Sequence, residues 1–235
     1  TPDIYKIRMY LHNTTRDDIY LSKSIPLFTE DNEARIFLGV IFDYFEEVHC
    51  EFCGVRKFFH LVDANIGAKN LQAIFGDSYL LQTTMKYICI LDSDQKSDLS
   101  KYTIILPGGN SPEKVIMDYA LELYDNDSFF WTAETILELN YGKIYFRDNI
   151  KQDIEQISLT LQELRRENKS THGVERELRK KVFLKHQRFF ELLFKHWIHD
   201  DEYSESVNKF YKQLNIMFKK VAVFYGINPN LWIID

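Results

Sequence analysis

The chain has 235 residues, of which 45% are hydrophobic and 15% aromatic, so it can bury a sizeable core and does not have the composition of a disordered protein. Its formal net charge of −6 argues against a generic basic DNA-binding protein. The charge is uneven, because residues 1–135 hold 12 Lys and Arg against 21 Asp and Glu, whereas residues 136–235 hold 17 against 14. An acidic half that needs cations, followed by a basic half, is compatible with an enzyme that acts on nucleic acid.

Three cysteines do not make a disulfide framework, and neither a signal peptide nor a membrane-spanning apolar run is visible. We therefore expect a cytoplasmic protein without a membrane partner. Cys50 and Cys53 have the spacing of metal ligands, with His49 and His60 nearby, but there is no second cysteine pair. Two ordinary, partly buried thiols are the favoured interpretation over a zinc site. The chain starts at Thr1 without an initiator Met, which is compatible with a fragment of a longer protein.

In chain order, residues 4–11 and 18–22 are predicted to form a lead-in hairpin within residues 1–24. From residue 25 the pattern is strand, helix, strand, helix, strand, strand, helix. The strands are expected at 25–28, 57–62, 87–91 and 102–106. This order predicts an α/β fold with a mostly parallel sheet flanked by helices, and we expect this core to span residues 25–135.

Beyond it, apolar residues at helical spacing predict a helical subdomain over 136–235, with helices near 150–164, 175–199 and 207–224. We expect this part to pack on the sheet or to form a homo-oligomer. The middle helix carries His186 on its apolar stripe, where a core histidine is the favoured interpretation over a catalytic one. Beside the stripe lies a basic face made of Lys181, Lys185, Arg188, Lys195 and His199. Such a density of charge suits phosphates, and a solvated helix face is the equally weighted alternative.

Acidic side chains follow two of the predicted strands at the points where they end. Glu30 follows the first strand, and Asp92 and Asp94 follow the third. Residues i and i+2 of an extended segment point the same way, and the carboxyl ends of parallel strands share one edge. The three carboxylates can therefore meet there and bind a hard cation, although Asp-x-Asp after a strand is also ordinary turn chemistry. Asp63 follows the second strand and is interpreted as a turn residue.

The order of Glu30, then Asp92-Ser93-Asp94, then LPGG-x-SPE at 106–113 resembles the Toprim nuclease domain of the OLD family of ATP-dependent endonucleases. The resemblance covers about residues 25–125 well and the helical remainder loosely. Many Toprim domains have Glu-Gly where this chain has Glu30-Asp31, and a further acid where it has Ala34. Asp31 and Glu33 are candidates to replace that acid, so the second ligand after the first strand stays open.

The resemblance implies a metal-dependent DNA endonuclease of the antiphage-defence type. Glu30, Asp92 and Asp94 would bind Mg²⁺ or Mn²⁺, in a site for two ions, to neutralise the scissile phosphate and activate a water. Glu113 would be a second-tier metal ligand or, with at least equal weight, a helix cap. No phosphate-binding loop occurs in the sequence, so the ATPase that the family implies must lie in a domain or subunit outside this chain.

A phosphodiester transition state also gathers negative charge that a lysine or arginine can stabilise. The stretch KHQRFF at 185–190 is similar to the place from which OLD nucleases are thought to draw a catalytic lysine. We therefore expect Lys185 to be catalytic, with Lys195 as the runner-up, and Lys181, Arg188 and Lys195 to contact DNA.

Two other classes of function stay open. A topoisomerase or primase-like Toprim enzyme shares the motifs, but it would need a nucleophilic tyrosine domain or a polymerase partner, and none of the 14 tyrosines is singled out by the sequence. A degenerate Toprim module that scaffolds a larger complex would fit the loss of Glu-Gly.

Overall fold

A computed structural model describes residues 23–76, 86–171 and 173–234. Residues 1–22 of the predicted lead-in hairpin lie outside this range, so the hairpin stays a prediction. Contacts divide the chain into two units. The sheet unit consists of the described residues up to Ser111 together with those from Asp200 onward, and the helical unit is Pro112–His199.

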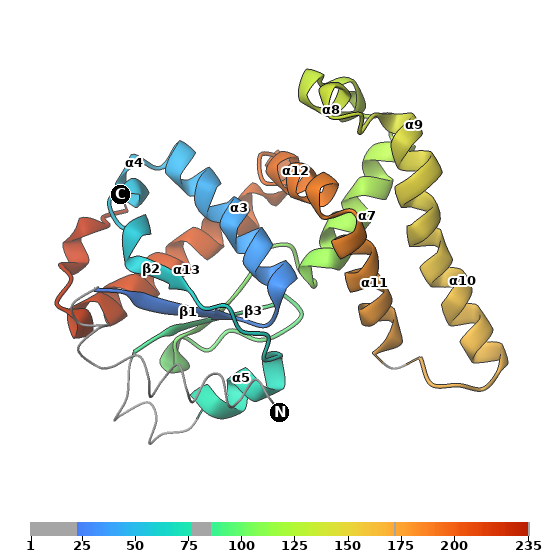
Figure 1. Cartoon of the computed structure of the whole chain (residues 1–235). Coiled ribbons are helices and arrows are strands. Elements are labelled where there is room, and N and C mark those ends of the chain that lie inside the picture. The colour runs from blue at the N-terminus through green and yellow to red at the C-terminus, as the bar shows by residue number, and fades with distance from the viewer. Residues whose placement is uncertain (1–22, 77–85, 172, 235) are drawn as a thin grey trace. The chain divides into compact units, whose positions relative to one another are not determined.

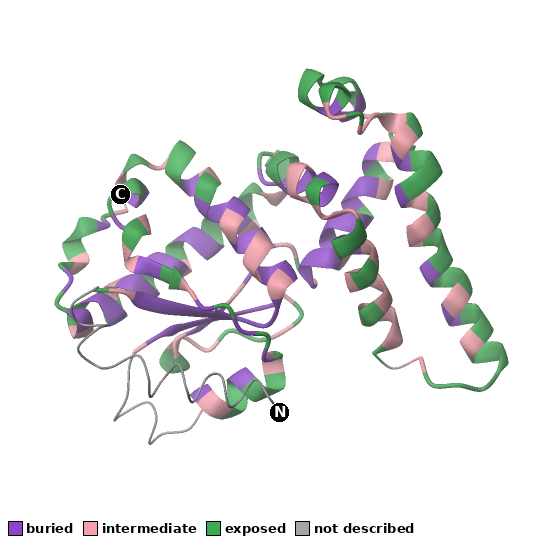
Figure 2. Ribbon diagram, in the orientation of Figure 1, coloured by how far each residue is buried: buried purple, intermediate pink, exposed green. Residues whose placement is uncertain are grey.

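Four strands form the sheet: β1 Ile25–Thr29, β2 Phe59–Leu61, β3 Ile88–Leu91 and β4 Thr103–Ile105. Their order is β2-β1-β3-β4 and every pair is parallel, so the prediction of an α/β fold with a mostly parallel sheet is confirmed (Figure 1). In the register, Leu27 faces Leu61 on one side and Ile88 on the other. The two central strands, β1 and β3, are buried along their whole length, which is why they are apolar without alternation (Figure 2).

Helices cover both faces of the sheet. Helix α3 (Asn32–Val48) joins β1 to β2, the short α4 (Cys50–Cys53) follows it, and α5 (Ala68–Phe75) follows β2. The first crossover leads from β1 to β2 at one edge of the sheet, and the second leads from β2 back across β1 to β3. Because the two crossovers run in opposite directions and both are right-handed, α3 and α5 lie on opposite faces. Figure 1 shows this arrangement, with α13 (Ser204–Ala222) on the same face as α3.

Helix α13 belongs to the sheet unit, although the sequence placed it in a helical subdomain over 136–235. Its apolar stripe faces the sheet and α3: the Phe218 ring lies 5.8 Å from Phe59, and the Phe210 ring 6.3 Å from Phe45. The segment after it is also anchored, because the Tyr225 hydroxyl donates to the Lys86 carbonyl at 2.5 Å. The boundaries between the two units fall at residues 111/112 and 199/200. The sequence analysis expected the helical subdomain to begin at residue 136, after a core that follows the lead-in hairpin at residue 25.

The helical unit contains α7 (Pro112–Asp125), α8 (Glu134–Glu138), α9 (Lys143–Tyr145), α10 (Gln152–Arg166), α11 (Val174–Lys185) and α12 (Gln187–Trp197). A π-helical segment, η4 (Phe146–Lys151), joins α9 to α10. Short 3₁₀ turns complete the chain at Arg56–Phe58, Leu99–Lys101, Phe129–Thr132, Asp201–Tyr203, Val223–Tyr225 and Pro229–Leu231.

The prediction of one helix over 175–199 is wrong, because the helix breaks at His186. His186 has φ −118° and ψ 27°, and its main-chain N–H bonds to the carbonyls of Val182 and Phe183 as α11 ends. Its ring is held from α10, since His186 Nε2 lies 2.6 Å from Asp153 Oδ2. The expected continuous basic face is therefore split, with Lys181 and Lys185 on α11 and the remaining basic residues beyond the break.

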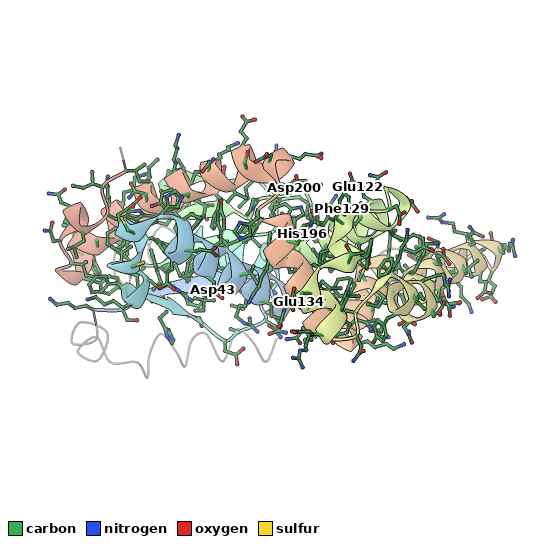
Figure 3. The ribbon with its side chains drawn as sticks, turned by 90° about the horizontal axis from the view of Figure 1, so that it is seen from above. Asp43, Glu122, Phe129, Glu134, His196 and Asp200 are labelled. Atoms are coloured by element: carbon green, nitrogen blue, oxygen red, sulfur yellow. The ribbon has the colours of Figure 1, made fainter. Side chains whose placement is uncertain are left out.

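Aromatic side chains build the core of the helical unit. Phe130, Trp131, Phe146 and Phe189 are buried, and the rings of Trp131 and Phe146 are 4.9 Å apart. The His196 ring lies 4.9 Å from Phe130, whereas the neighbouring Phe129 is 92% exposed (Figure 3).

Among the described residues, no helix combines the length and the apolar character that crossing a bilayer requires.

Candidate metal centre

The acidic residues predicted from the sequence sit where the two central strands end. Glu30 directly follows β1 and Asp92 directly follows β3, and these strands are neighbours in the sheet. From β1 the chain runs outward to β2 on one side, whereas β3 lies on the other side, so the order of the strands reverses between β1 and β3. In open α/β sheets such a switch point, at the carboxyl ends of the strands, is where ligands bind.

Glu30, Asp92 and Asp94 each offer one carboxylate oxygen such that these oxygens all lie within 4.8 Å of one another. Within the described part of the chain, this is the one group of three or more His, Cys, Asp or Glu side chains with that spacing. The structure thus brings together the three acids that the sequence analysis selected.

A backbone hydrogen bond fixes the Glu30 carboxylate against the residue that carries the second acid. The main-chain N–H of Asp92 donates to Glu30 Oε1 at 2.9 Å, and the Glu30 carbonyl accepts from the N–H groups of Ile66 and Gly67 at 3.0 and 3.1 Å. Glu30 is 1% exposed and Asp92 0%. Burial, and after it the negative charge of Glu30, raises the pKa of the Cys89 thiol on β3. Glu30 and Asp92 therefore form a rigid pair of ligands in a poorly solvated place.

Asp94 is different, because it is exposed. Its Oδ1 accepts a hydrogen bond from Gln95 Nε2 at 2.8 Å, and Gln95 Oε1 accepts from Gln72 Nε2 of α5 at 3.5 Å. The sequence analysis did not select Gln95 or Gln72. The signal for Gln95 was its position next to the second aspartate, whereas nothing in the sequence pairs it with Gln72.

The PGG segment holds the loop that carries the two aspartates. The Gly109 N–H donates to Ser93 Oγ at 2.9 Å. Gly108 and Gly109 have φ of 108° and 78°, a region that favours glycine, so the backbone can turn there and present this N–H to Ser93. The loop between the acids is thereby tied to the segment after β4.

This donor set fits a hard divalent cation. Mg²⁺ binds oxygen at about 2.1 Å, so its ligand atoms lie about 3 Å apart when adjacent and about 4 Å apart when opposite. Oxygens within 4.8 Å of one another need to close by at most about 2 Å to match that geometry. Without a cation, three carboxylates this close repel one another, which favours binding of positive charge.

Asp31 and Glu33, the two candidates for a further ligand after β1, do not belong to the cluster. Asp31 is the N-cap of α3, since its Oδ1 accepts the Ala34 N–H at 3.0 Å. The side chain that could have replaced the missing acid therefore stabilises the start of a helix. Glu33 lies in the first turn of that helix and is buried.

The structure agrees with a turn role for Asp63, whose side chain is 96% exposed and pairs with Arg35 at 2.9 Å. Arg35 also donates to the Ala64 carbonyl at 2.8 Å and to Asn65 Oδ1 at 2.9 Å. Arg35 thus stabilises the loop that contains Ile66 and Gly67, whose N–H groups donate to the Glu30 carbonyl. Arg35 was not selected from the sequence, where one arginine in a first helical turn carries no signal.

The other predicted site residues lie in the helical unit. Glu113, in the first turn of α7, is buried with Arg176 Nε of α11 at 3.8 Å from its Oε1. This ion pair gives Glu113 a structural function, and its role as a metal ligand stays a prediction. Arg188 and Lys195 are exposed on α12.

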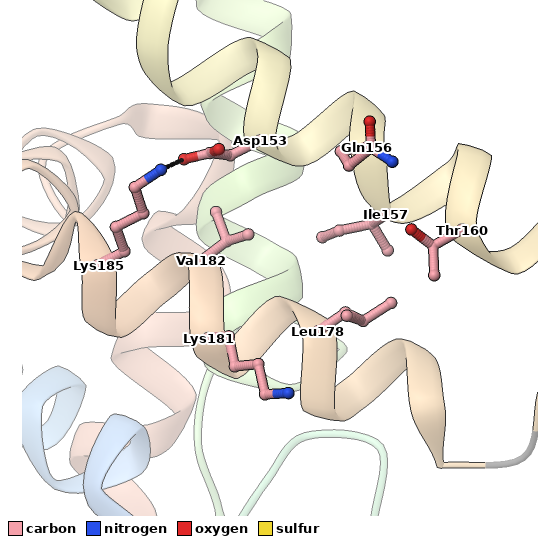
Figure 4. A pocket seen from close by; sticks show the side chains of 8 residues that line it. All are labelled: Asp153, Gln156, Ile157, Thr160, Leu178, Lys181, Val182 and Lys185. Carbon is pink, nitrogen blue, oxygen red and sulfur yellow. Dashed lines mark hydrogen bonds and ion pairs between the residues drawn. The ribbon is translucent and has the colours of Figure 1, made fainter.

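Lys185 occupies the last turn of α11, at one end of a pocket of about 180 Å³ between α10 and α11 (Figure 4). Its Nζ lies 2.7 Å from Asp153 Oδ2, the same oxygen that contacts His186. Burial alone would raise the pKa of Asp153, but the hydrogen bonds from Lys185 and His186 outweigh it and hold that pKa below its ordinary value. Lys181 lines the pocket one turn earlier on the same helix.

Cys50 and Cys53 are exposed, which corrects the expectation of partly buried thiols. Cys53 Sγ donates to the Glu46 carbonyl at 3.3 Å, so it is turned toward the end of α3. The two residues form no metal-binding group with other described side chains.

Neither the protein-family models, nor the curated proteins, nor the solved structures contain a match to this chain.

Proposed function

We propose that the chain is a divalent-metal-dependent DNA endonuclease in which Glu30, Asp92 and Asp94 bind Mg²⁺ or Mn²⁺. The observation that carries this proposal is the convergence of three carboxylates at the switch point of a parallel sheet. The order of the acidic motifs and of LPGG-x-SPE, which resembles the OLD family, supports DNA as the substrate.

The three carboxylates differ in exposure, and we assign their roles accordingly. Glu30 and Asp92 are buried, and the Glu30 carboxylate is tied to the Asp92 main chain, so they set the position of the cation with little cost in side-chain ordering. Asp94 faces solvent, which supports an approach of the phosphate from its side. An ion held by these three residues would act as a Lewis acid toward the phosphoryl oxygen and would activate a water as the nucleophile. The chain holds its ligands so that little reorganisation is needed during the reaction.

Plasmid nicking in Mg²⁺ and in Mn²⁺ tests the proposal. Asp92→Asn and Glu30→Gln keep the size of each side chain but remove one charge, and we expect each to lower the cleavage rate by at least about a hundredfold, because ligand charge stabilises the transition state through the ion. Asp63→Asn is the matched control, an exposed acid that follows β2 of the same sheet. Nicking by Asp92→Asn at the wild-type rate would refute the assignment.

The resemblance also supports a partner. We propose that an ATPase domain or subunit outside these residues controls the nuclease, so the 235-residue chain alone binds the ion but cuts slowly. Adding the ATPase should then change the rate or make it depend on nucleotide. Equal, nucleotide-insensitive cutting with and without the ATPase would remove this part of the proposal.

A scaffold without catalysis is the second candidate, and one observation favours it. Asp31 caps α3 and Ala34 is apolar, so fewer acids reach the cluster than in many Toprim domains. Calorimetric titration with Mn²⁺ separates the two candidates, because a scaffold shows no binding that Asp92→Asn abolishes.

A further inference from the structure

A second pocket lies in the sheet unit, and some of its lining residues follow Asp94 directly in the sequence. Its volume is about 390 Å³, and it is bounded by the end of α5 and by the segment from Lys96 to Thr103. Ligand pockets in proteins start at about 300 Å³, so one nucleotide unit can enter a space of this size.

Hydrogen bonds connect this pocket to the metal centre. Gln72, which lines the pocket, donates to Gln95, and Gln95 donates to the Asp94 carboxylate. Lys96 follows Gln95 directly and lines the pocket as well. Two residues span at most about 7 Å, so the backbone of Lys96 lies within that distance of Asp94.

The charges on the pocket wall favour an anion. Lys96 is exposed and takes part in no ion pair within residues 23–76, 86–171 and 173–234. Lys101 Nζ lies 3.8 Å from Asp98 Oδ2. The other oxygen of this carboxylate, Oδ1, accepts hydrogen bonds from the N–H and the hydroxyl of Ser100, at 3.0 and 2.5 Å. Among the described lining residues, the two lysines and one aspartate give a net positive charge, beside a cluster of three acids.

The remaining described lining residues offer hydroxyl groups and an aromatic ring. Ser97 and Thr103 carry hydroxyls, whose oxygens can accept a hydrogen bond, and Phe75 lies at the end of α5. A sugar hydroxyl or a base amino group is a donor that such acceptors suit, whereas the phosphate of the same nucleotide suits Lys96. A phosphate ion alone would leave these acceptors unused.

We propose that this pocket binds the nucleotide of the DNA strand that adjoins the cleaved phosphodiester, with Lys96 as its main phosphate contact. The inference rests on the proposed function, since it assumes that the strand passes the Glu30, Asp92 and Asp94 centre. It adds a substrate subsite and gives Gln95 a positioning role between subsite and centre.

Fluorescence anisotropy with a fluorescein-labelled 12-nucleotide single strand, in Ca²⁺ and at 50–200 mM NaCl, tests the subsite in the full chain. We expect Lys96→Ala to weaken binding about tenfold and to reduce the slope of log affinity against log salt by about 0.7, the value for one lost phosphate contact on a single strand. Lys96→Arg keeps the charge and should bind within about twofold of the wild type. Lys212→Ala, an exposed lysine on α13, is the matched control and should change neither quantity.

Calorimetric titration with Mn²⁺ on the same proteins separates the two proposals. Unchanged Mn²⁺ affinity in Lys96→Ala, together with weaker DNA binding, supports the subsite. The subsite is overturned if Lys96→Ala matches Lys212→Ala in affinity and slope, or if its Mn²⁺ affinity falls in parallel with its DNA affinity. If only the subsite proposal is wrong, the wild type still cleaves DNA. If the proposed function is wrong, the wild type neither cleaves nor binds DNA, and that result overturns both proposals.

Discussion

The main-chain N–H of Asp92 donates a hydrogen bond of 2.9 Å to Glu30 Oε1, across 62 positions of the chain. This bond ties the residue after β3 to the residue after β1, and both residues are buried. The acidic centre is thus organised by the backbone of the sheet.

Mn²⁺ should stabilise the folded chain through this centre. A ligand that binds only the folded state at 100 times its dissociation constant adds about 2.7 kcal/mol to the free energy of unfolding. We expect urea unfolding in Mn²⁺ and in EDTA to show this difference for the wild type and for Asp63→Asn. Asp92→Asn should show no difference, and in EDTA it should be as stable as the wild type or more so, because one repulsive charge is gone. Equal stabilisation of Asp92→Asn by Mn²⁺ would contradict a site built on that carboxylate.

Asp31 should prove to be a helix cap and not a metal ligand. Because its Oδ1 accepts the Ala34 N–H, Asp31→Ala should lower the free energy of unfolding by about 1 kcal/mol. Asp31→Ser can still cap α3 and should retain most of that stability. Neither substitution should change the Mn²⁺ affinity measured by calorimetry. A drop in Mn²⁺ affinity with unchanged stability would instead place Asp31 among the ligands.

The acidic centre could be predicted because its signals are local and its assembly follows from topology. Glu30 and Asp92 each follow an apolar strand, and parallel strands bring their carboxyl ends to one edge. The function of Asp31 could not be predicted in the same way. An aspartate between a strand and a helix suits either a cation or the first N–H groups of the helix, and only the folded structure distinguishes these two roles.

The arrangement of the helices was harder to predict. The stripe of α13 indicated a buried face, and the sequence left open whether the sheet or a second copy of the chain would bury it. Between α11 and α12 the spacing of Val182, His186 and Phe189 fits one continuous helix. The break at His186 comes with a contact to Asp153, 33 positions away, which helical periodicity cannot show.

Because Asp153 contacts Lys185 and His186, the free energy of unfolding should depend on pH in the acid range. The pKa of Asp153 is lower in the folded chain than its ordinary value of 3.8, so the contribution is present above about pH 4 and is lost as pH falls through the folded pKa. We expect Asp153→Asn to lower the free energy of unfolding by about 1 kcal/mol at pH 7, since the pair is partly exposed. The difference from the wild type should shrink below pH 4.

Glu163→Gln is the control for this effect, because Glu163 is an exposed acid on the same helix α10. Urea unfolding at pH 7, 5, 4 and 3 gives the comparison. A constant difference between Asp153→Asn and the wild type across this range would show that the carboxylate charge plays no part.

Lys185 should act on the cleavage step, and Lys195 is the alternative. The ion pair with Asp153 holds the Lys185 ammonium in one direction from the end of α11, and a fixed cation loses less entropy when it meets a phosphate. A lysine that stabilises the transition state is worth several kcal/mol in a water-poor site, so we expect Lys185→Ala to slow single-turnover cleavage by about a hundredfold with DNA affinity retained. Lys195→Ala should leave that rate within about threefold of the wild type.

Lys169→Ala, an exposed lysine of the helical unit beyond α10, controls for the loss of one positive charge. DNA affinity and single-turnover rate are measured together, since the ratio between them separates catalysis from binding. A salt-dependent loss of affinity in both Lys185→Ala and Lys195→Ala, with the cleavage step unchanged, would make these lysines phosphate contacts. A loss of the cleavage step in Lys195→Ala alone would transfer the catalytic role to Lys195, and no change in either variant would leave the basic residues of α11 and α12 as solvated side chains.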